Sequence, residues 1–212
     1  MVRVLQIDTS PRYQQSHSRM LAREFVEKWS NYHPETQIIH RDLGLNPVPY
    51  IDATWVKAKF TPPDQYTPEL AAAIALSDEL IDELLSADRY VLSTPMYNFS
   101  IPAVLKSYID HIVRPRRTFD VDESGFKGLV TDKKMLVVTA RGSDFRPSSV
   151  LAPLDFQEPF LRTVFNFIGI TDIQFVNANG LNTRLQEQSL AEVQETLRKL
   201  AIAGKNSNLL DV

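Results

Sequence analysis

The sequence predicts an α/β fold in which helices cover both faces of a doubly wound parallel sheet of five strands. Short apolar segments alternate along the chain with longer segments whose apolar residues recur every three or four positions. This alternation is typical of a parallel sheet, because parallel strands are joined by crossover helices. The segments also follow one another without a linker, an internal repeat or a low-complexity tract. We therefore expect residues 1–212 to form a single domain.

Five segments have the length and the apolar, β-branched composition of strands. Their residue ranges are 2–7, 37–41, 90–94, 134–139 and 173–176. The third begins at Tyr90 with a short apolar run, which is typical of a strand buried on both faces. The second is shorter and more polar, which favours a place at an edge of the sheet.

The helices expected between these strands carry recognisable start signals. In the first, apolar residues recur at helical spacing over 21–29, and Ser16 or Ser18 is suited to the N-cap position. The second begins at Thr67-Pro68-Glu69, which supplies a cap, a proline and an acid in the expected order. The third follows Pro102, whose fixed φ suits a first helical turn.

Two more helices are expected in the C-terminal half. The first spans 153–167, with Gly169 well placed as the residue after its end. The second has apolar residues at helical spacing over 190–200, and Gly204 is expected to stop it. The tail after Lys205 is expected to be loose.

Two segments interrupt the regular alternation. Residues 43–66 form a long stretch with four prolines, in which Trp55, Val56 and Phe60 suggest one short helical turn. Long loops inside compact domains tend to be functional or mobile, but composition does not indicate the role of this one. Residues 118–130 contain two glycines and predict a β-hairpin.

The composition excludes several classes of chemistry. The chain has no cysteine, which excludes disulfides, thiolate nucleophiles, zinc-thiolate sites and cysteine-ligated iron–sulfur clusters. A net charge of −3 is too weak to indicate nucleic acid or an anionic membrane as a partner. No apolar run is long enough to cross a bilayer and the first residues do not resemble a signal peptide, so we expect a cytoplasmic protein.

The loop after the first strand is rich in hydroxyl groups. Ser10, Ser16 and Ser18 precede or open the first helix, whose free N–H groups and dipole favour a phosphate. The loop has no glycine and matches neither a dinucleotide-binding motif nor a Walker loop, so a monophosphate fits better than a pyrophosphate. By residue type alone, an ordinary serine N-cap explains the pattern better than a phosphate site, and the position of the loop after the first strand is what favours the phosphate.

The loop after the third strand contains two aromatic residues and an amide. Met96, Tyr97, Asn98 and Phe99 follow Pro95 at the carboxyl end of a buried strand, where open α/β sheets bind their ligands. These side chains suit a flat ring with polar edges. They can equally fold back into the core, and this loop alone leaves both interpretations open.

A third loop, 140–143, follows the fourth strand. Its Gly142 permits a positive φ and a close approach of the backbone to a ligand. In the flavodoxin-like strand order 2-1-3-4-5, strands one, three and four are neighbours, and their three loops meet at one edge. One loop suits a phosphate, one a flat ring and one close backbone contact, which together predict an FMN site.

The chain resembles the FMN-dependent NADH:quinone oxidoreductases that also reduce azo compounds, the bacterial azoreductase family. The resemblance covers essentially the whole chain, and the loop 95–99 is its most specific motif. The matching segments are Pro95-Met96-Tyr97-Asn98-Phe99, Ser10 with Ser16-x-Ser18, Thr139-x-Arg141-Gly142, Phe167-Ile168-Gly169-Ile170-Thr171-Asp172, and 75–81.

This resemblance implies a homodimer with FMN in two sites near the subunit interface. It implies a ping-pong cycle in which NADH, or NADPH, reduces FMN and leaves before a quinone or an azo compound accepts the electrons. It also implies that Ser10, Ser16, His17 and Ser18 hold the phosphate arm, and that Pro95, Met96, Tyr97, Asn98 and Phe99 hold the isoalloxazine ring. The loop of Ala140, Arg141, Gly142 and Ser143 would meet the pyrimidine side.

The chain departs from the family pattern in the last of these loops. Ala140 and Ser143 stand where the family often has serine and glycine, so a hydroxyl contact is absent at 140. Contacts through backbone N–H groups would be little affected.

The remaining candidates have two interpretations each. The basic cluster 114–117 is a solvated turn or a contact to a cofactor phosphate, and Phe119 is hairpin packing or a substrate contact. The four histidines lack metal-ligand spacing, and no residue is expected to act as a covalent catalyst. The alternative function is a flavodoxin-like electron carrier without substrate turnover, although such carriers tend to be shorter and strongly acidic.

Overall fold

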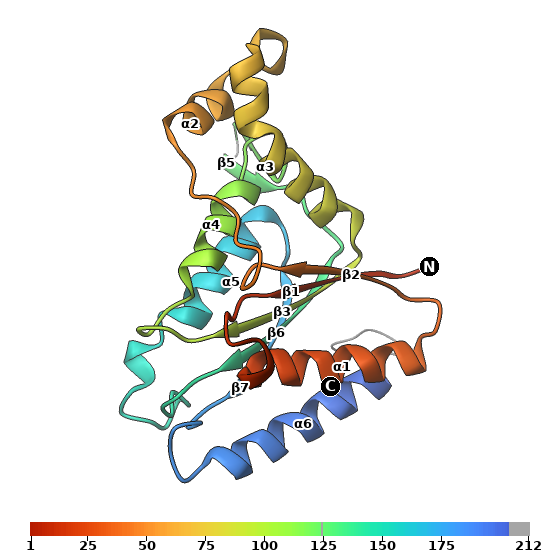
Figure 1. The fold of residues 1–212 in the computed structure, drawn as a ribbon, viewed down its shortest axis with the longest axis vertical. Helices are drawn as coiled ribbons and strands as arrows, with labels where there is room; N and C mark the ends of the chain where they lie inside the picture. The colour runs from red at the N-terminus through yellow and green to blue at the C-terminus, as the bar shows by residue number, and fades with distance from the viewer. Residues whose placement is uncertain (124, 204–212) are drawn as a thin grey trace.

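The computed structural model describes residues 1–123 and 125–203, and it places all five expected strands in one parallel sheet. The strands are β1 (Arg3–Asp8), β2 (Gln37–Asp42), β3 (Arg89–Pro95), β6 (Lys134–Ala140) and β7 (Asp172–Ala178). Their order in the sheet is β2-β1-β3-β6-β7 (Figure 1). Counted among these five strands alone, this is the order 2-1-3-4-5, with the polar second strand at one edge.

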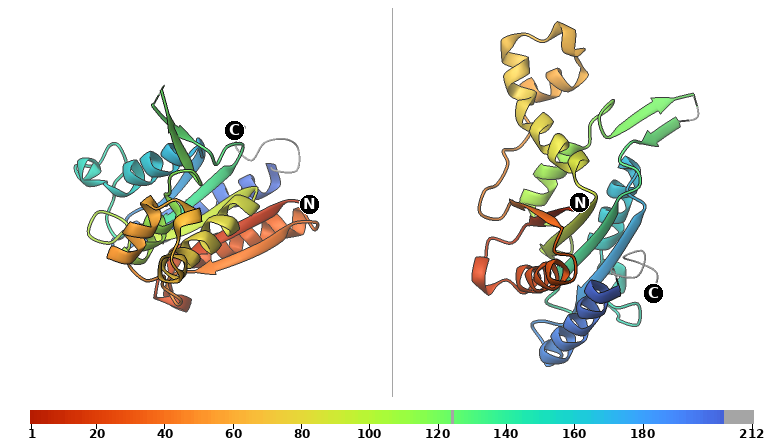
Figure 2. Two further views of the ribbon diagram at one scale, coloured as in Figure 1. Left: turned by 90° about the horizontal axis from the view of Figure 1, so that it is seen from above. Right: turned by 90° about the vertical axis from the view of Figure 1, so that its right-hand side faces the viewer.

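The gap in the strand numbers arises from the predicted hairpin. Strands β4 (Phe119–Asp122) and β5 (Gly125–Gly128) pair with each other in an antiparallel ladder and do not join the main sheet. Figure 2 shows this hairpin, in green, projecting from the body of the protein.

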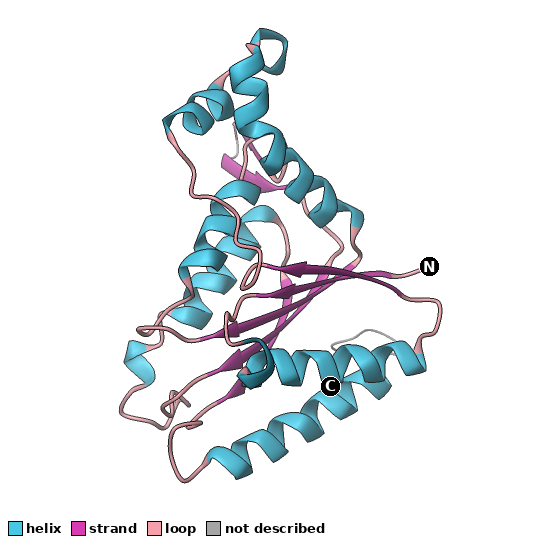
Figure 3. Cartoon of the chain, in the orientation of Figure 1, coloured by secondary structure: helices cyan, strands magenta, loops and turns pink. Residues whose placement is uncertain are grey.

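Helices cover both faces of the sheet, as Figure 3 shows. On one face lie α1 (His17–Tyr32) and α6 (Gln186–Ala203), and on the other lie α3 (Pro68–Ser86), α4 (Ala103–Ile112) and α5 (Gln157–Ile168). Each face has its own apolar core, because successive strand residues point to opposite sides. Val4 packs with Phe25 and Val193 on the first face, whereas Leu5 packs with Leu105 on the second.

The long stretch before α3 contains the expected short helix. It is α2 (Ala53–Phe60), which buries Trp55 and Ala58 against Leu70 and Ile74 of α3. Figure 2 shows α2 and the adjoining part of α3 projecting from the sheet. Within the residues the structure describes, no helix combines the length and the apolar character that crossing a membrane requires.

Three of the predicted helix ends are confirmed by their capping geometry. The side chain of Ser16 accepts from the Arg19 N–H at 3.4 Å, and that of Thr67 accepts from the Leu70 N–H at 3.3 Å. Gly169 ends α5 with a φ of 108°, a left-handed conformation that glycine adopts without steric cost. The prediction that Gly204 stops α6, and that of a loose tail after Lys205, lie outside the described residues.

The predicted start of α5 is wrong by four residues. Residues Ala152–Leu154 form a separate 3-10 turn, and α5 begins at Gln157. The reason is Asp155, whose carboxylate accepts from the Gln157 N–H at 2.9 Å and from the Glu158 N–H at 3.1 Å. These bonds satisfy two of the amides that a helix start leaves without partners. The uniform apolar spacing of this segment concealed the acidic cap.

Candidate functional site

The loops after β1, β3, β6 and β7 enclose a cleft at the carboxyl edge of the sheet. The cleft lies where open α/β sheets bind their ligands. Its lining residues are Ser10, Arg12, Gln15, Ser16, His17, Pro95, Met96, Tyr97, Ala140, Arg141, Gly142, Leu181 and Asn182. The three loops predicted to act together therefore meet in one place.

Four of the predicted residues lie beside the cleft without lining it. Ser18 is fully buried behind Ser16, with the two hydroxyl oxygens 3.2 Å apart. Asn98 and Phe99 form the exposed tip of their loop. Ser143 is half-buried, and its carbonyl accepts from the Gly180 N–H at 2.9 Å.

The first loop delivers the start of α1 to the cleft. The N–H groups of His17 and Ser18 come before Met20, whose N–H is the first to donate to a carbonyl of the helix start, so helix geometry leaves them available to a ligand. The Ser16 and Ser18 hydroxyls lie next to them and are buried. Donors of this kind at a positive dipole end suit a phosphate. Ser16 is at the same time the N-cap, so the capping and the ligand interpretations apply together.

Arg19 holds the first loop from behind. Its Nε donates to the Ser10 carbonyl at 2.7 Å, and its other nitrogens bond the carboxylate of Asp42. Burial lowers the pKa of Arg19, but the hydrogen bond with Asp42 and the charges of Asp8 and Asp42 outweigh it, and the net pKa is raised. Gly44 is required here, since a Cβ at that position would lie 2.3 Å from the Ser10 carbonyl oxygen. The loop is therefore held in one shape by a charged and closely packed support.

The second loop forms a tight turn beside the cleft. The backbones of Tyr97 and Ser100 exchange two hydrogen bonds of 3.0 Å, and the residues between them have positive φ angles, 48° at Asn98 and 69° at Phe99. Tyr97 is 39% exposed and Phe99 45%, so neither folds back into the core. The Phe99 ring packs edge-on against Phe145 instead. The structure thus decides against the core-packing interpretation of this loop.

The third loop offers its backbone rather than its side chains. The Arg141 guanidinium is buried and donates to Asp155 at 2.8 Å and to Gln157 at 3.2 Å. The backbone N–H of Arg141 donates to the Ala178 carbonyl. Among the described residues, no hydrogen-bond acceptor is found for the N–H groups of Gly142 and Ser143. Gly142 does not use the positive φ that glycine permits. Because Gly142 has no side chain, Asn182 can pack against it; a Cβ on residue 142 would lie only 2.6 Å from the Asn182 Nδ2.

Gln157 joins the second and third loops, a role that the sequence did not indicate. Its side chain is fully buried, donates to the Pro95 carbonyl at 2.9 Å and accepts from the Arg141 Nε at 3.2 Å. The Met96 N–H also donates to the Ala140 carbonyl at 2.9 Å. The two loops therefore form one connected wall of the cleft.

Four residues that line the cleft are not among those predicted from the sequence. Arg12 and Gln15 lie within the hydroxyl-rich loop, and their long polar side chains were passed over in favour of the serines. Leu181 and Asn182 follow β7, the neighbour of β6. The rule that ligands bind at the carboxyl ends of parallel strands applies equally to that strand and would have found them.

The structure does not bring Phe119 or the basic cluster to this cleft. The Phe119 ring packs on Phe126 and on Phe167, at the far end of α5 from Gln157. The solvated-turn interpretation of 114–117 is wrong, because Arg114 is buried and both Arg114 and Arg117 bond Asp78 of α3. No group of three potential metal-binding side chains occurs within the described ranges.

Comparison with known proteins shows first the fold family of this chain and then its relatives. Residues 2–201 match the model of a family described as having a flavodoxin-like fold. A relative from Nostoc punctiforme, the "FMN-dependent NADH:quinone oxidoreductase", is 56% identical over 93% of this chain and 97% of its own length. One from Azotobacter vinelandii with the same name is 43% identical over 95% of this chain and 100% of its own length.

A solved structure agrees with these relatives. It is that of an FMN-dependent NADH-azoreductase from Bacillus anthracis in complex with FMN, with a TM-score of 0.89 and 28% identity over 97% of this chain and 100% of that one. The chain belongs to the family of FMN-dependent NADH:quinone oxidoreductases.

Proposed function

We propose that this protein is an FMN-dependent oxidoreductase that passes two electrons from NADH to quinones and also reduces azo compounds. The observation that carries the proposal is the single cleft lined by the loops after β1, β3 and β6, in a chain 56% identical to a named FMN-dependent NADH:quinone oxidoreductase. Bound FMN would supply the redox chemistry, and the protein would supply binding, orientation and electrostatics.

The first loop is assigned to the phosphate of FMN. The N–H groups of His17 and Ser18 and the hydroxyl of Ser16 are the donors, with Ser10 at the base of the loop. Ser18 acts through Ser16, because its hydroxyl is buried behind it. Arg19 and Gly44 keep these donors in place without contacting the ligand.

The second and third loops are assigned to the ring. Pro95, Met96 and Tyr97 line one side, while the turn at Asn98 and Phe99 closes it. The N–H groups of Gly142 and Ser143 are donors for the polar edge, where negative charge increases on reduction. Ala140 and Ser143 then contribute through the backbone, so the departure of their side chains from the family pattern is harmless.

We further propose a homodimeric, cytoplasmic protein of one domain, with a ping-pong cycle. Phe119 requires a second subunit to act in the site. It lies at the far end of α5, about 15 Å along the helix from Gln157 at 1.5 Å per residue. The hairpin β4–β5 projects from the body of the protein (Figure 2), and we propose that Phe119 of one subunit contacts the cleft of the other.

A steady-state assay tests the proposal. The purified protein should oxidise NADH in the presence of either a quinone or an azo dye, and replacing NADH by NADPH measures the preference between them. Parallel lines in double-reciprocal plots are expected for a ping-pong cycle. A yellow protein that does not turn over would instead be an electron carrier, and a protein that takes up no FMN would contradict the proposal.

A further inference from the structure

A second cavity lies beside the cleft, between the edge strand β2 and the beginning of α1. It holds about 820 Å³ and shares only Ser16 with the lining of the cleft. Strand residues Asp8 and His40 form its floor, while Arg19 and Arg23 of α1 contribute to its wall. Nothing in the proposed oxidoreductase activity uses this space.

The only carboxylate in the lining is fully engaged within the protein. Asp8 is 4% exposed, and its Oδ2 accepts from the His40 Nε2 at 2.8 Å and from the Gln6 Nε2 at 3.2 Å. Its Oδ1 accepts from the hydroxyl of Ser93, and the Arg19 Nη1 lies 3.6 Å from Oδ2. Because this negative charge is buried and balanced, it offers a ligand little repulsion.

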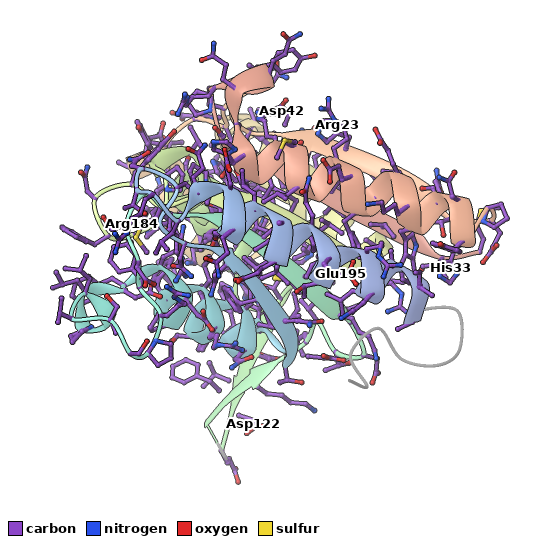
Figure 4. All side chains as sticks on the ribbon, turned by 90° about the horizontal axis from the view of Figure 1, so that it is seen from below. Arg23, His33, Asp42, Asp122, Arg184 and Glu195 are labelled. Atoms are coloured by element: carbon purple, nitrogen blue, oxygen red, sulfur yellow. The ribbon has the colours of Figure 1, made fainter. Side chains whose placement is uncertain are left out.

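Two cationic side chains keep unused donors. His40 is 48% exposed at its side chain, and since Asp8 occupies Nε2, Nδ1 is the nitrogen left for a ligand. Arg23 is exposed and makes no hydrogen bond or ion pair that the described residues record. Figure 4 shows Arg23 on α1, at the end of the molecule where Asp42 also lies. The lining thus carries more positive than negative charge, which favours an anion.

The surroundings of His40 favour its charged form. The hydrogen bond to Asp8 raises the pKa of His40, burial opposes it, and the charges of Asp8 and Asp42 outweigh that of Arg19. In the protonated ring both nitrogens are donors, so Nδ1 can donate while Nε2 stays on Asp8.

The cavity also has an apolar side. Tyr13 is 57% exposed and Met20 half-buried, and both line it. Tyr13 has a φ of 36°, an uncommon conformation for an aromatic residue, which places its ring on the 3-10 turn beside the cavity. An aromatic ring and a thioether suit a flat apolar body.

We infer that this cavity is a binding site for a small aromatic carboxylate, whose anionic group is held by Arg23 and His40 and whose ring packs against Tyr13 and Met20. The guanidinium fork matches a carboxylate, and charge-assisted hydrogen bonds are stronger than neutral ones. The inference does not depend on flavin binding.

Calorimetric titration of the purified protein with benzoate at about pH 6 tests the inference, because benzoate and protonated His40 then coexist. Acetate is the matched probe for the anionic group alone. We expect one benzoate per chain and binding at least about tenfold tighter than that of acetate, since only benzoate buries a ring. Equal affinities for benzoate and acetate would show that the ring does not pack against Tyr13 and Met20.

Variants locate the site. Arg23→Gln and His40→Gln should each weaken benzoate by about tenfold, the effect of losing one charge-assisted hydrogen bond. Lys28→Gln, which removes the same charge from α1 outside the cavity lining, should not change the affinity. Benzoate that binds equally well to all three variants would overturn the inference. A second result would also overturn the inference: benzoate binding that shifts the flavin absorbance and is lost in a flavin-free preparation. Benzoate would then occupy the cleft and not the second cavity.

Discussion

At the scale of single residues, the tip of the second loop holds two residues in an uncommon backbone conformation. Asn98 and Phe99 both have positive φ angles, which asparagine tolerates and phenylalanine rarely adopts. The two hydrogen bonds between Tyr97 and Ser100 hold them there. A turn with this geometry is stabilised by glycine or asparagine and weakened by residues with a simple Cβ.

Two substitutions at Asn98 distinguish its effect on the stability of the turn from its effect on ligand binding. Asn98→Ala should lower the free energy of unfolding by about 1 kcal/mol, whereas Asn98→Gly should leave it nearly unchanged, because glycine adopts positive φ without cost. Both remove the side-chain amide that the family resemblance assigns to the ring, so both should weaken FMN retention. Urea unfolding and FMN titration measure the two effects. If Asn98→Gly retains FMN as the unaltered protein does, the amide is not a ligand contact.

His40 makes stability depend on pH. Its pKa is raised in the folded protein by the hydrogen bond to Asp8, against the opposing effect of burial. This contribution is fully present below the ordinary pKa of about 6.5 and is lost as the pH rises through the higher folded value.

The pH dependence is measured as a difference between two proteins. The stability advantage of the unaltered protein over His40→Gln should shrink as the pH rises above about 6.5, the ordinary pKa of histidine, because the folded protein holds the His40 proton more tightly than the unfolded chain does. Urea unfolding at several pH values gives this difference directly. A difference that stays constant with pH would mean that His40 and Asp8 are not coupled.

At the scale of elements, the start of α5 joins the loops of the cleft. Gln157 bonds both Pro95 and Arg141, and the Phe156 N–H donates to the Phe99 carbonyl at 3.0 Å. The helix therefore positions two loops that come from different strands. The loops are held by the scaffold before any ligand arrives, which reduces the cost of ordering them on binding.

Gln157→Leu should disrupt this arrangement. It leaves the Arg141 Nε without a partner in the interior and removes one hydrogen bond to the Pro95 carbonyl, which keeps that of the Thr94 hydroxyl at 3.3 Å. We expect a loss of about 1 to 3 kcal/mol, the cost of one buried group left unpaired. FMN should also dissociate faster. Gln188→Leu, at an exposed position of α6, is the control and should change stability by less than about 0.5 kcal/mol. Unaltered stability and FMN release in Gln157→Leu would show that the bridge is not needed.

The elements also show what the sequence could predict. All five strands, the edge position of β2 and the caps at Ser16, Thr67 and Gly169 follow from local patterns. The start of α5 could not be predicted from a local pattern, because the side chain that caps it, Asp155, lies outside the helix. Long-range partners such as Gln157 with Pro95, 62 residues apart, carry no local signal at all. The buried state of Arg114 was missed for the same reason, since its partners lie on α3.

At the scale of the whole molecule, strand order brings the loops of the candidate site together. The order β2-β1-β3-β6-β7 makes neighbours of the strands that end in the three loops, so residues near 10, 96 and 142 line one cleft. The sequence identified each loop by chemistry and the common cleft by the expected order. It could not separate lining residues from supporting ones, because that depends on side-chain direction at Ser18, Asn98 and Ser143.

The central claim is that α1 begins at the phosphate of a bound FMN. Titrating the flavin-free protein with FMN and with riboflavin, which lacks the phosphate, tests it most directly. The unaltered protein should bind FMN more tightly than riboflavin. Replacing Ser16 and Ser18 together by alanine should remove most of that difference while leaving riboflavin binding unchanged. Equal losses for both flavins, or no preference for FMN in the unaltered protein, would contradict the account.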